Sequence, residues 1–189
     1  MFQPSPEVQK EMVSLLHGMG LTPSDPYTAI HIRFGGLLGE RKNVMRSHLD
    51  QMTSLHASLR CALQLSQTHN IPEGNLVLIT DNLELKALLL EGFFRNVLTT
   101  NTTPAHSGPQ LNSSLVDARV HLMTVADMGV LAGARAIVAD RFGGFGLQAR
   151  LWGGVTLAET PDTETRFVAT PDCISRERIL DQHIAGVKT

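Results

Sequence analysis

The chain has 189 residues, within the usual size of one domain, and 42% of them are hydrophobic, enough to bury a core. With 18% charged residues and a net charge of −2, it does not have the composition of a disordered chain. Lysine and arginine form no run or stripe, so we expect no nucleic-acid partner and no anionic membrane partner. A single globular domain over residues 1–189 is therefore predicted.

Signals for metal binding and for targeting are missing from the sequence. The 8 histidines are scattered, and Cys61 and Cys173 lie far apart without a CxxC motif, so no metal site is expected. The two cysteines could pair in an oxidising compartment or be two buried thiols, and base rates favour thiols. The N-terminus has no signal-peptide pattern, and no run reaches the ~18 apolar residues of a membrane helix. We expect either an untargeted soluble protein or a piece of a longer one.

Hydrophobic periodicity divides the first half of the chain into alternating helices and strands. Helices are predicted at residues 4–21, 44–70 and 83–92. Strands are predicted at residues 27–33, 75–81 and 95–100. The first two of these strands are apolar enough to be buried on both faces. Residues 101–114 are polar and contain two prolines, which predicts a loop or lid.

The second half continues the alternation. Helical spacing covers residues 116–134, in two pieces that are expected to meet near Thr124. Strands are predicted at 134–140 and 154–159, and helices at 145–152 and 174–187. Because mostly apolar strands alternate with helices, the sequence predicts an α/β fold, a Rossmann-like parallel sheet with helices on both faces.

Polar residues and glycines collect where the predicted strands end. These ends hold Arg33-Phe34-Gly35-Gly36, Thr80-Asp81-Asn82, Thr100-Asn101 and Asp140-Arg141-Phe142-Gly143-Gly144. In an open parallel sheet, ligands bind outside the carboxyl ends of the strands. We therefore expect a ligand site at this edge.

Arg33 and two glycine turns point to a nucleotide diphosphate. Arg33 leaves its strand with a planar fork of donors that suits a pair of phosphates. Gly35 and Gly36 allow backbone N–H groups to approach phosphate oxygens without a Cβ in the way. The turn at residues 143–146 opens a helix whose N-terminus favours an anion, so the two turns could clamp one diphosphate. Asp81 is a candidate acceptor for a ribose or base.

Structural explanations for the same residues stay open. Arg33 could be an ion-pair partner of Asp81 or Asp140, since ion pairs at strand ends are common. His31 lies between apolar strand residues and is by default a core histidine bonded to backbone; the alternative is a role in supporting Arg33. The glycines of the 143–146 turn could serve the turn and its packing alone.

Two aspartates have helix-capping explanations as well. Asp81, in the sequence TDN, could cap the helix that follows it. Asp127 stands three residues after Thr124, a TxxD pattern typical of a capping box. Each acid is thus either a helix cap or part of the ligand site.

Three stretches, taken together and in order, resemble a known family. HIRFGG resembles the HxRxG motif of the superfamily of α1,2-, α1,6- and protein O-fucosyltransferases, which use GDP-fucose. VLITDN resembles their second motif, a strand that ends in TD. DMGVLAGARAIVADRFGGFGLQAR resembles their third, in which an Asp opens a helix, a strand follows, and an SSFS-like turn leads to an Arg. The three motifs fall within residues 27–152.

The resemblance implies a GT-B-like enzyme with two Rossmann-like halves, of which this chain is the nucleotide-sugar-binding half. Such enzymes transfer fucose from GDP-fucose to an acceptor hydroxyl with inversion and without a metal or other cofactor. Arg33 matches their essential catalytic arginine, which contacts the diphosphate. The implied substrate-binding positions are His31, Gly35, Gly36, Asp81, Asp127, Gly143, Gly144, Phe145, Gly146 and Arg150.

The sequence also departs from the family pattern. The serines of the SSFS-like turn fall on Gly143, Gly144 and Gly146, so backbone donors remain but hydroxyl donors do not. Each lost hydrogen bond to a charged group costs about 1.5–3 kcal/mol. The sequence offers no clear base for the acceptor hydroxyl; Glu40 follows the first motif, but a solvated loop glutamate is the commoner case. We expect the acceptor-binding half to lie outside this chain, which alone would bind the donor without turning it over.

The implied partners are a nucleotide sugar and a glycan or protein acceptor. Two other functions stay open: a non-catalytic nucleotide-sugar-binding module, and an unrelated doubly wound nucleotide-binding domain. The family works in the Golgi or ER lumen, or in the bacterial cytoplasm, and no sorting signal in the sequence chooses between these compartments.

Overall fold

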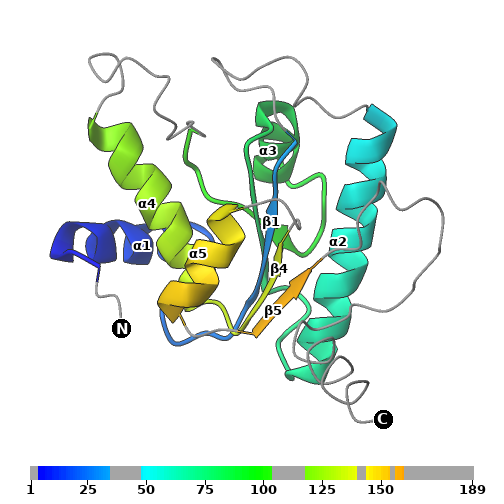
Figure 1. The fold of residues 1–189 in the computed structure, drawn as a ribbon, viewed down its shortest axis with the longest axis horizontal. Helices are drawn as coiled ribbons and strands as arrows, with labels where there is room; N and C mark the ends of the chain where they lie inside the picture. The colour runs from blue at the N-terminus through cyan, green and yellow to red at the C-terminus, as the bar shows by residue number, and fades with distance from the viewer. Residues whose placement is uncertain (1–3, 35–47, 104–117, 140–143, 154–155, 160–189) are drawn as a thin grey trace, which may run out of the picture.

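The computed structural model describes residues 4–34, 48–103, 118–139, 144–153 and 156–159. Within these ranges, five parallel strands form one sheet: β1 (Thr28–Ile32), β2 (Leu76–Thr80), β3 (Val97–Leu98), β4 (Ala136–Ala139) and β5 (Thr156–Glu159). The helices are α1 (Pro6–Gly18), α2 (His48–Thr68), α3 (Leu83–Leu90), α4 (Ala118–Gly133) and α5 (Gly144–Gly153). Figure 1 shows helices on both sides of the sheet, which confirms the predicted Rossmann-like α/β fold.

The strand order β3-β2-β1-β4-β5 places β1 at the centre of the sheet. From β1 the chain builds outward through β2 to β3, then returns to the other side of β1 to add β4 and β5. The direction of growth therefore reverses between β1 and β4. Crevices at such switch points, outside the carboxyl ends of the strands, are where open α/β sheets bind ligands.

Two apolar clusters, one on each face of the sheet, form the core. In β1, Ala29 contributes to the cluster under α1, α4 and α5, whereas its neighbour Ile30 contributes to the cluster under α2 and α3. β2 alternates in the same way, with Val77 in the first cluster and Leu78 in the second. Because successive strand residues point to opposite faces, strands covered on both sides must be apolar throughout.

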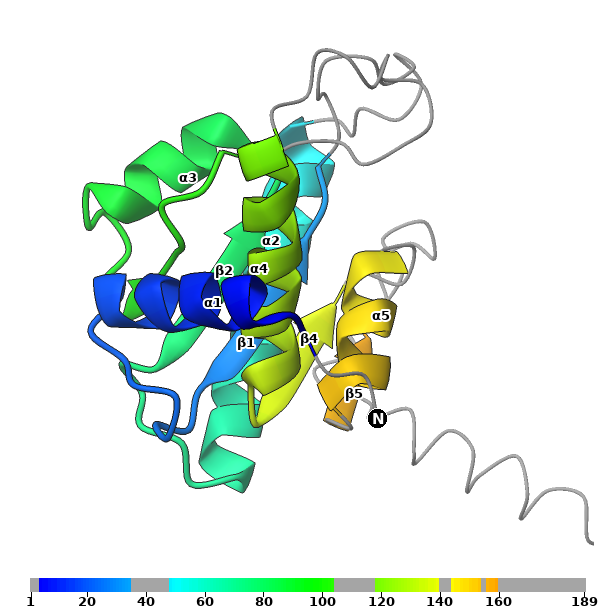
Figure 2. The same ribbon diagram turned by 90° about the vertical axis from the view of Figure 1, so that its left-hand side faces the viewer.

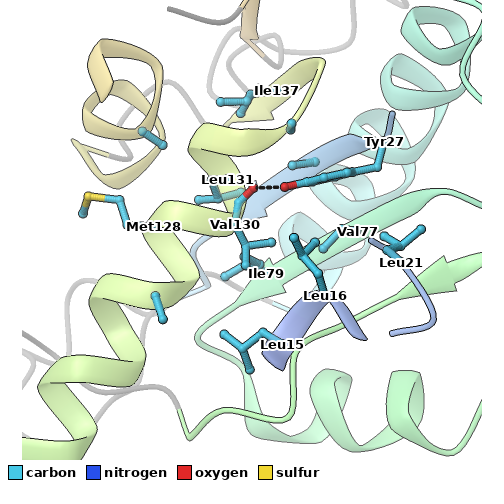
Figure 3. Packing of buried hydrophobic residues seen from close by; sticks show 14 of the residues in the cluster. Leu15, Leu16, Leu21, Tyr27, Val77, Ile79, Met128, Val130, Leu131 and Ile137 are labelled. Carbon is cyan, nitrogen blue, oxygen red and sulfur yellow. Dashed lines mark hydrogen bonds between the residues drawn. The ribbon is translucent and has the colours of Figure 1, made fainter. Parts of the chain in front are cut away.

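The packing of α1 on α4 depends on a close approach at Gly129. A Cβ at Gly129 would lie 2.2 Å from the sulfur of Met12, so the glycine makes room for that side chain. Nearby, the buried Tyr27 hydroxyl donates a 2.5 Å hydrogen bond to the carbonyl of Val130, as Figure 3 shows. Figure 2 shows α1 crossing beside α4 on this face of the sheet. These contacts fix α4 against the core.

The predicted break in the 116–134 helix is wrong. α4 runs without interruption from Ala118 to Gly133, and Thr124 lies within it. The Thr124 hydroxyl donates to the carbonyl of Val120 at 2.9 Å, a bond within the helix. The capping-box interpretation of Asp127 is wrong for the same reason, because Asp127 has a helical turn on either side of it.

The described residues also decide the sequence-based expectation about Cys61. Cys61 is buried on α2 and disulfide-bonded, and no described cysteine is free, so the buried-thiol interpretation is wrong for this residue. Cys173 and the helix predicted at 174–187 lie outside the described residues. No helix in the described part of the chain combines the length and the apolarity that crossing a membrane requires.

Candidate functional site

Arg33 and Asp81 stand side by side where β1 and β2 end. The register pairs Ile32 with Thr80, so the next residue on each strand is one member of this pair. The Nε atom of Arg33 lies 3.8 Å from Oδ2 of Asp81, and the Phe34 backbone N–H donates to Oδ1 at 2.7 Å. The Arg33 side chain nevertheless remains 41% exposed, against 11% for Asp81.

This arrangement bears on two of the alternatives raised by the sequence. The ion pair between Arg33 and Asp81, one of the structural alternatives, is present, but at 3.8 Å and with a half-exposed guanidinium it is a weak contact. Asp81 is not the cap of the next helix, because the Asn82 side chain accepts from the backbone N–H of Leu85 at 2.8 Å and fills the N-cap position of α3. Asp81 instead fixes the backbone just after Arg33.

His31 lies at the switch point, in register with Ala139 of β4. It is buried, with 8% exposure, and its ring stacks on that of Phe145 from α5, with centroids 5.1 Å apart. Within the part of the chain that the structure describes, no hydrogen bond reaches its Nδ1, so that atom does not make the backbone bond of the core-histidine interpretation. Burial first, and the Arg33 charge second, lower the pKa of His31 from 6.5 to about 4. The ring is therefore neutral at pH 7.

The low pKa of His31 predicts a loss of stability in mild acid. Because the folded state binds this proton less readily than the unfolded state, His31 stabilises the fold above pH 6.5 and that contribution disappears as the pH falls through about 4. The shift corresponds to roughly 3 kcal/mol. Urea unfolding between pH 7 and 4 measures it. A His31→Phe variant should lose much less stability over that interval, and equal pH slopes in both proteins would contradict the prediction.

A buried polar chain links α3 to α4 at the end of β3. The ammonium of Lys86 donates to the Thr102 hydroxyl at 2.6 Å, and that hydroxyl donates to Oδ2 of Asp127 at 2.6 Å. Thr100 stands beside them, 3.5 Å from the Lys86 nitrogen and 3.2 Å from the Thr102 oxygen. All four side chains are buried. An ammonium that donates to a hydroxyl, which in turn donates to a carboxylate, is a polarised chain.

One carboxylate oxygen of Asp127 lacks a hydrogen bond from the described residues. Its Oδ1 atom is buried and has no hydrogen-bond partner among the described residues; the residue as a whole is 6% exposed. Burial raises the pKa of Asp127, while Lys86 and the threonine hydroxyls oppose that rise. Burial lowers the pKa of Lys86, and Asp127 opposes it. Buried polar atoms in native proteins are nearly always paired, so the orphaned oxygen marks a place that a ligand could complete.

Some of the remaining candidate site residues lie in the described ranges and others do not. Gly35, Gly36 and Gly143, with the alternatives Glu40 and Asp140, lie outside the described residues. Gly144 begins α5, and Phe145, Gly146 and Arg150 lie along that helix, which follows β4 on the side of the switch point where His31 stands. Their roles at a phosphate stay predictions. No group of three metal-ligating side chains occurs in the described ranges.

Lys86 and Thr102 of the buried chain were not expected from the sequence, and Thr100 was expected only as a residue at a strand end. A lysine inside the apolar run LELKALLL was the available signal, because Lys86 proves to share the buried side of α3 with Leu85 and Leu89. Thr100 was noted as a strand-end residue, yet nothing in its spacing connects it with Asp127, 27 residues along the chain.

Comparison with known proteins yields structural matches alone. Neither a protein-family model nor a curated protein sequence matches the chain. The fucosyltransferase NodZ from Bradyrhizobium aligns with 82% of this chain at 16% identity and a TM-score of 0.51. NodZ α-1,6-fucosyltransferase co-crystallised with GDP aligns with 82% at 15% identity and a TM-score of 0.50. A mutant of FUT1 from Arabidopsis thaliana in complex with GDP covers 93% at 16% identity, with a TM-score of 0.49.

This chain spans less than half of the NodZ structures it matches, since each alignment covers 44% of the NodZ chain. At such low identity the likeness concerns the fold. The described chain thus has a fucosyltransferase-like α/β fold, the fold of part of NodZ.

Proposed function

We propose that this chain binds a guanosine diphosphate sugar at the carboxyl edge of its sheet, as the donor-binding half of a fucosyltransferase-like glycosyltransferase. One observation carries the proposal. A half-exposed arginine follows the central strand at the switch point. Two buried residues of the same motif set, His31 and Asp127, each hold a polar atom with which no described residue forms a hydrogen bond. A nucleotide supplies groups for both needs, namely phosphates for the arginine and a base for the buried atoms.

The chemistry of the orphaned carboxylate favours guanine. An ionised carboxylate accepts hydrogen bonds and donates none. Guanine presents two neighbouring donors, a ring N–H and an exocyclic NH₂, whereas adenine sets a donor beside an acceptor and uracil offers one N–H between two carbonyls. Oδ1 of Asp127 is thus matched by the donor edge of guanine. The neutral ring of His31, stacked on Phe145, adds a second polar atom in an otherwise apolar setting.

The fold comparison supports the same ligand class. One of the NodZ structures is that of an α-1,6-fucosyltransferase co-crystallised with GDP. The three ordered motifs in this sequence resemble those of GDP-fucose-dependent enzymes. Fucose as the sugar rests on these two likenesses and is part of the proposal.

Donor-side chemistry would fall to Arg33. Breaking the bond between sugar and phosphate leaves negative charge on the departing diphosphate, and a guanidinium already held in place stabilises that charge as it develops. Asp81 contributes by fixing the backbone of Phe34, and so the direction in which Arg33 leaves its strand. The acceptor hydroxyl and its base belong to the proposed second half of the enzyme, so activation of the acceptor is assigned to no described residue.

Calorimetry with this chain tests the proposal. We expect GDP and GDP-fucose to bind with similar affinity and at least about tenfold more tightly than ADP or UDP, because a mismatched base leaves Asp127 unpaired. Equal binding of all three diphosphates would contradict guanine recognition, and no binding of any would overturn the proposal. Consumption of GDP-fucose after addition of an acceptor half would distinguish an enzyme from a non-catalytic module. The glycines at the SSFS-like turn favour the non-catalytic module.

A further inference from the structure

We propose that Lys86 is a positioning residue: through the Thr102 hydroxyl it holds Oδ2 of Asp127 in place and leaves Oδ1 as the acceptor for the nucleobase. The proposal rests on the proposed function, because it concerns the guanine end of the same site. Lys86 belongs to none of the three motifs and lies on α3, a helix that supplies no other candidate site residue.

The geometry gives each group in the chain one direction. Lys86 donates to Thr102 at 2.6 Å, which leaves the Thr102 hydrogen to be donated to Asp127, also at 2.6 Å. A carboxylate bound through one oxygen to a fixed hydroxyl loses the freedom to rotate. Oδ2 is thereby committed to the protein, and no residue in the described ranges is a hydrogen-bond partner of Oδ1.

A purely structural ion pair would have a different appearance. A buried carboxylate is tolerated when both oxygens are bonded and its counter-ion is close, since an unmet oxygen in the interior costs as much as a lost hydrogen bond. Here the cation contacts Asp127 through a hydroxyl instead of directly, and one carboxylate oxygen is unmet. This arrangement leaves Oδ1 of Asp127 as an acceptor, while the positive charge of Lys86 compensates the carboxylate without touching it.

The segment that carries the hydroxyl is itself well anchored. Thr99, the residue after β3, donates from its side chain to the carbonyl of Leu78 at 2.8 Å. Thr100 follows, fully buried, and then Thr102 at 7% exposure. The hydroxyl that orients Asp127 is thus fixed to the sheet on one side and to α3 on the other.

The test compares the affinities of GDP and inosine diphosphate, which lacks the exocyclic amine of guanine. Wild-type protein should prefer GDP by about tenfold, the value of one hydrogen bond to a charged group. Lys86→Met and Thr102→Val should reduce that preference to about twofold or less, whereas Thr102→Ser, which keeps the hydroxyl, should retain it. Lys10→Met, at an exposed position of α1, controls for the loss of one positive charge.

A merely structural role predicts that both affinities fall together with the preference unchanged, and this result would overturn the proposal. If Lys86→Met does not fold, the comparison of Thr102→Val with Thr102→Ser tests the proposal instead. The double variant Lys86→Met/Asp127→Asn adds a second test, because it should show the same small preference for GDP as Asp127→Asn alone. If Asp127→Asn abolishes the preference while Thr102→Val keeps it, guanine binding stands and the role of Lys86 fails. If wild-type protein binds no GDP, the proposed function and this inference both fail.

Discussion

Replacing Arg33 with alanine is expected to weaken GDP binding by about 10- to 150-fold, the loss of one charge-assisted contact to a diphosphate. The guanidinium follows the central strand at the switch point and is 41% exposed, so it is accessible to a ligand at the carboxyl edge. Calorimetric titration of GDP into both proteins measures the effect. Arg33→Lys should fall between them, because a lysine keeps the charge and loses the planar fork.

A matched control distinguishes a phosphate contact from a general loss of charge. Arg95 is exposed and precedes β3, which places it toward the amino end of the strands, opposite the proposed site. Arg95→Ala should leave GDP affinity within about twofold of wild type. If Arg33→Ala behaves like Arg95→Ala, the guanidinium has a structural role, and the alternative of an unrelated doubly wound nucleotide-binding domain gains support.

The thermal stability of Arg33→Ala completes that comparison. The contact with Asp81 is long and half-exposed, so its loss should cost less than about 1 kcal/mol. Asp81 keeps its hydrogen bond from the Phe34 N–H in the variant. Affinity and stability are therefore expected to respond very differently to the same substitution.

The fold was predictable from the sequence because its signals are local. Strands such as LVLIT are apolar on both faces, and each is followed by a helix with its own start and stop, as in the Asn82 cap of α3 and Gly92 at φ +76° after its end. Parallel pairing then brings the strand ends together, which made Asp81 one of the two partners that the sequence predicted for Arg33. Local chemistry and sheet geometry were sufficient at these positions.

The Asp127 cluster was not predictable, because it depends on contacts far apart in the chain. The TxxD spacing of Thr124 and Asp127 is the same in a capping box and inside a helix, and α4 continues through it because its apolar residues pack on α1 and the sheet. The partner of Asp127 is Thr102, 25 residues away, and the partner of Thr102 is Lys86. A local pattern cannot identify a partner that packing brings from another element.

The largest effect on stability is expected from removing one member of the buried pair. Lys86→Met leaves Asp127 as a buried carboxylate without a compensating positive charge. Asp127→Asn leaves the Lys86 ammonium as a buried cation without a compensating negative charge. Each single variant should lose about 3–5 kcal/mol of unfolding free energy, measured with urea at pH 7. Lys86→Met/Asp127→Asn should recover most of that loss, because removing both charges also removes the cost of burying them.

The two single variants should respond to pH in opposite directions. In Lys86→Met, Asp127 has a folded pKa raised by burial, so the variant is least impaired near pH 4 and loses stability as the pH rises through that raised pKa. In Asp127→Asn, Lys86 has a folded pKa lowered by burial, so stability is best near pH 10 and is lost as the pH falls through that lowered pKa. The double variant should lack both dependences. Parallel pH profiles for the two single variants would show that the charges of Lys86 and Asp127 do not compensate each other, and the polar chain through Thr102 would then be a set of independent hydrogen bonds.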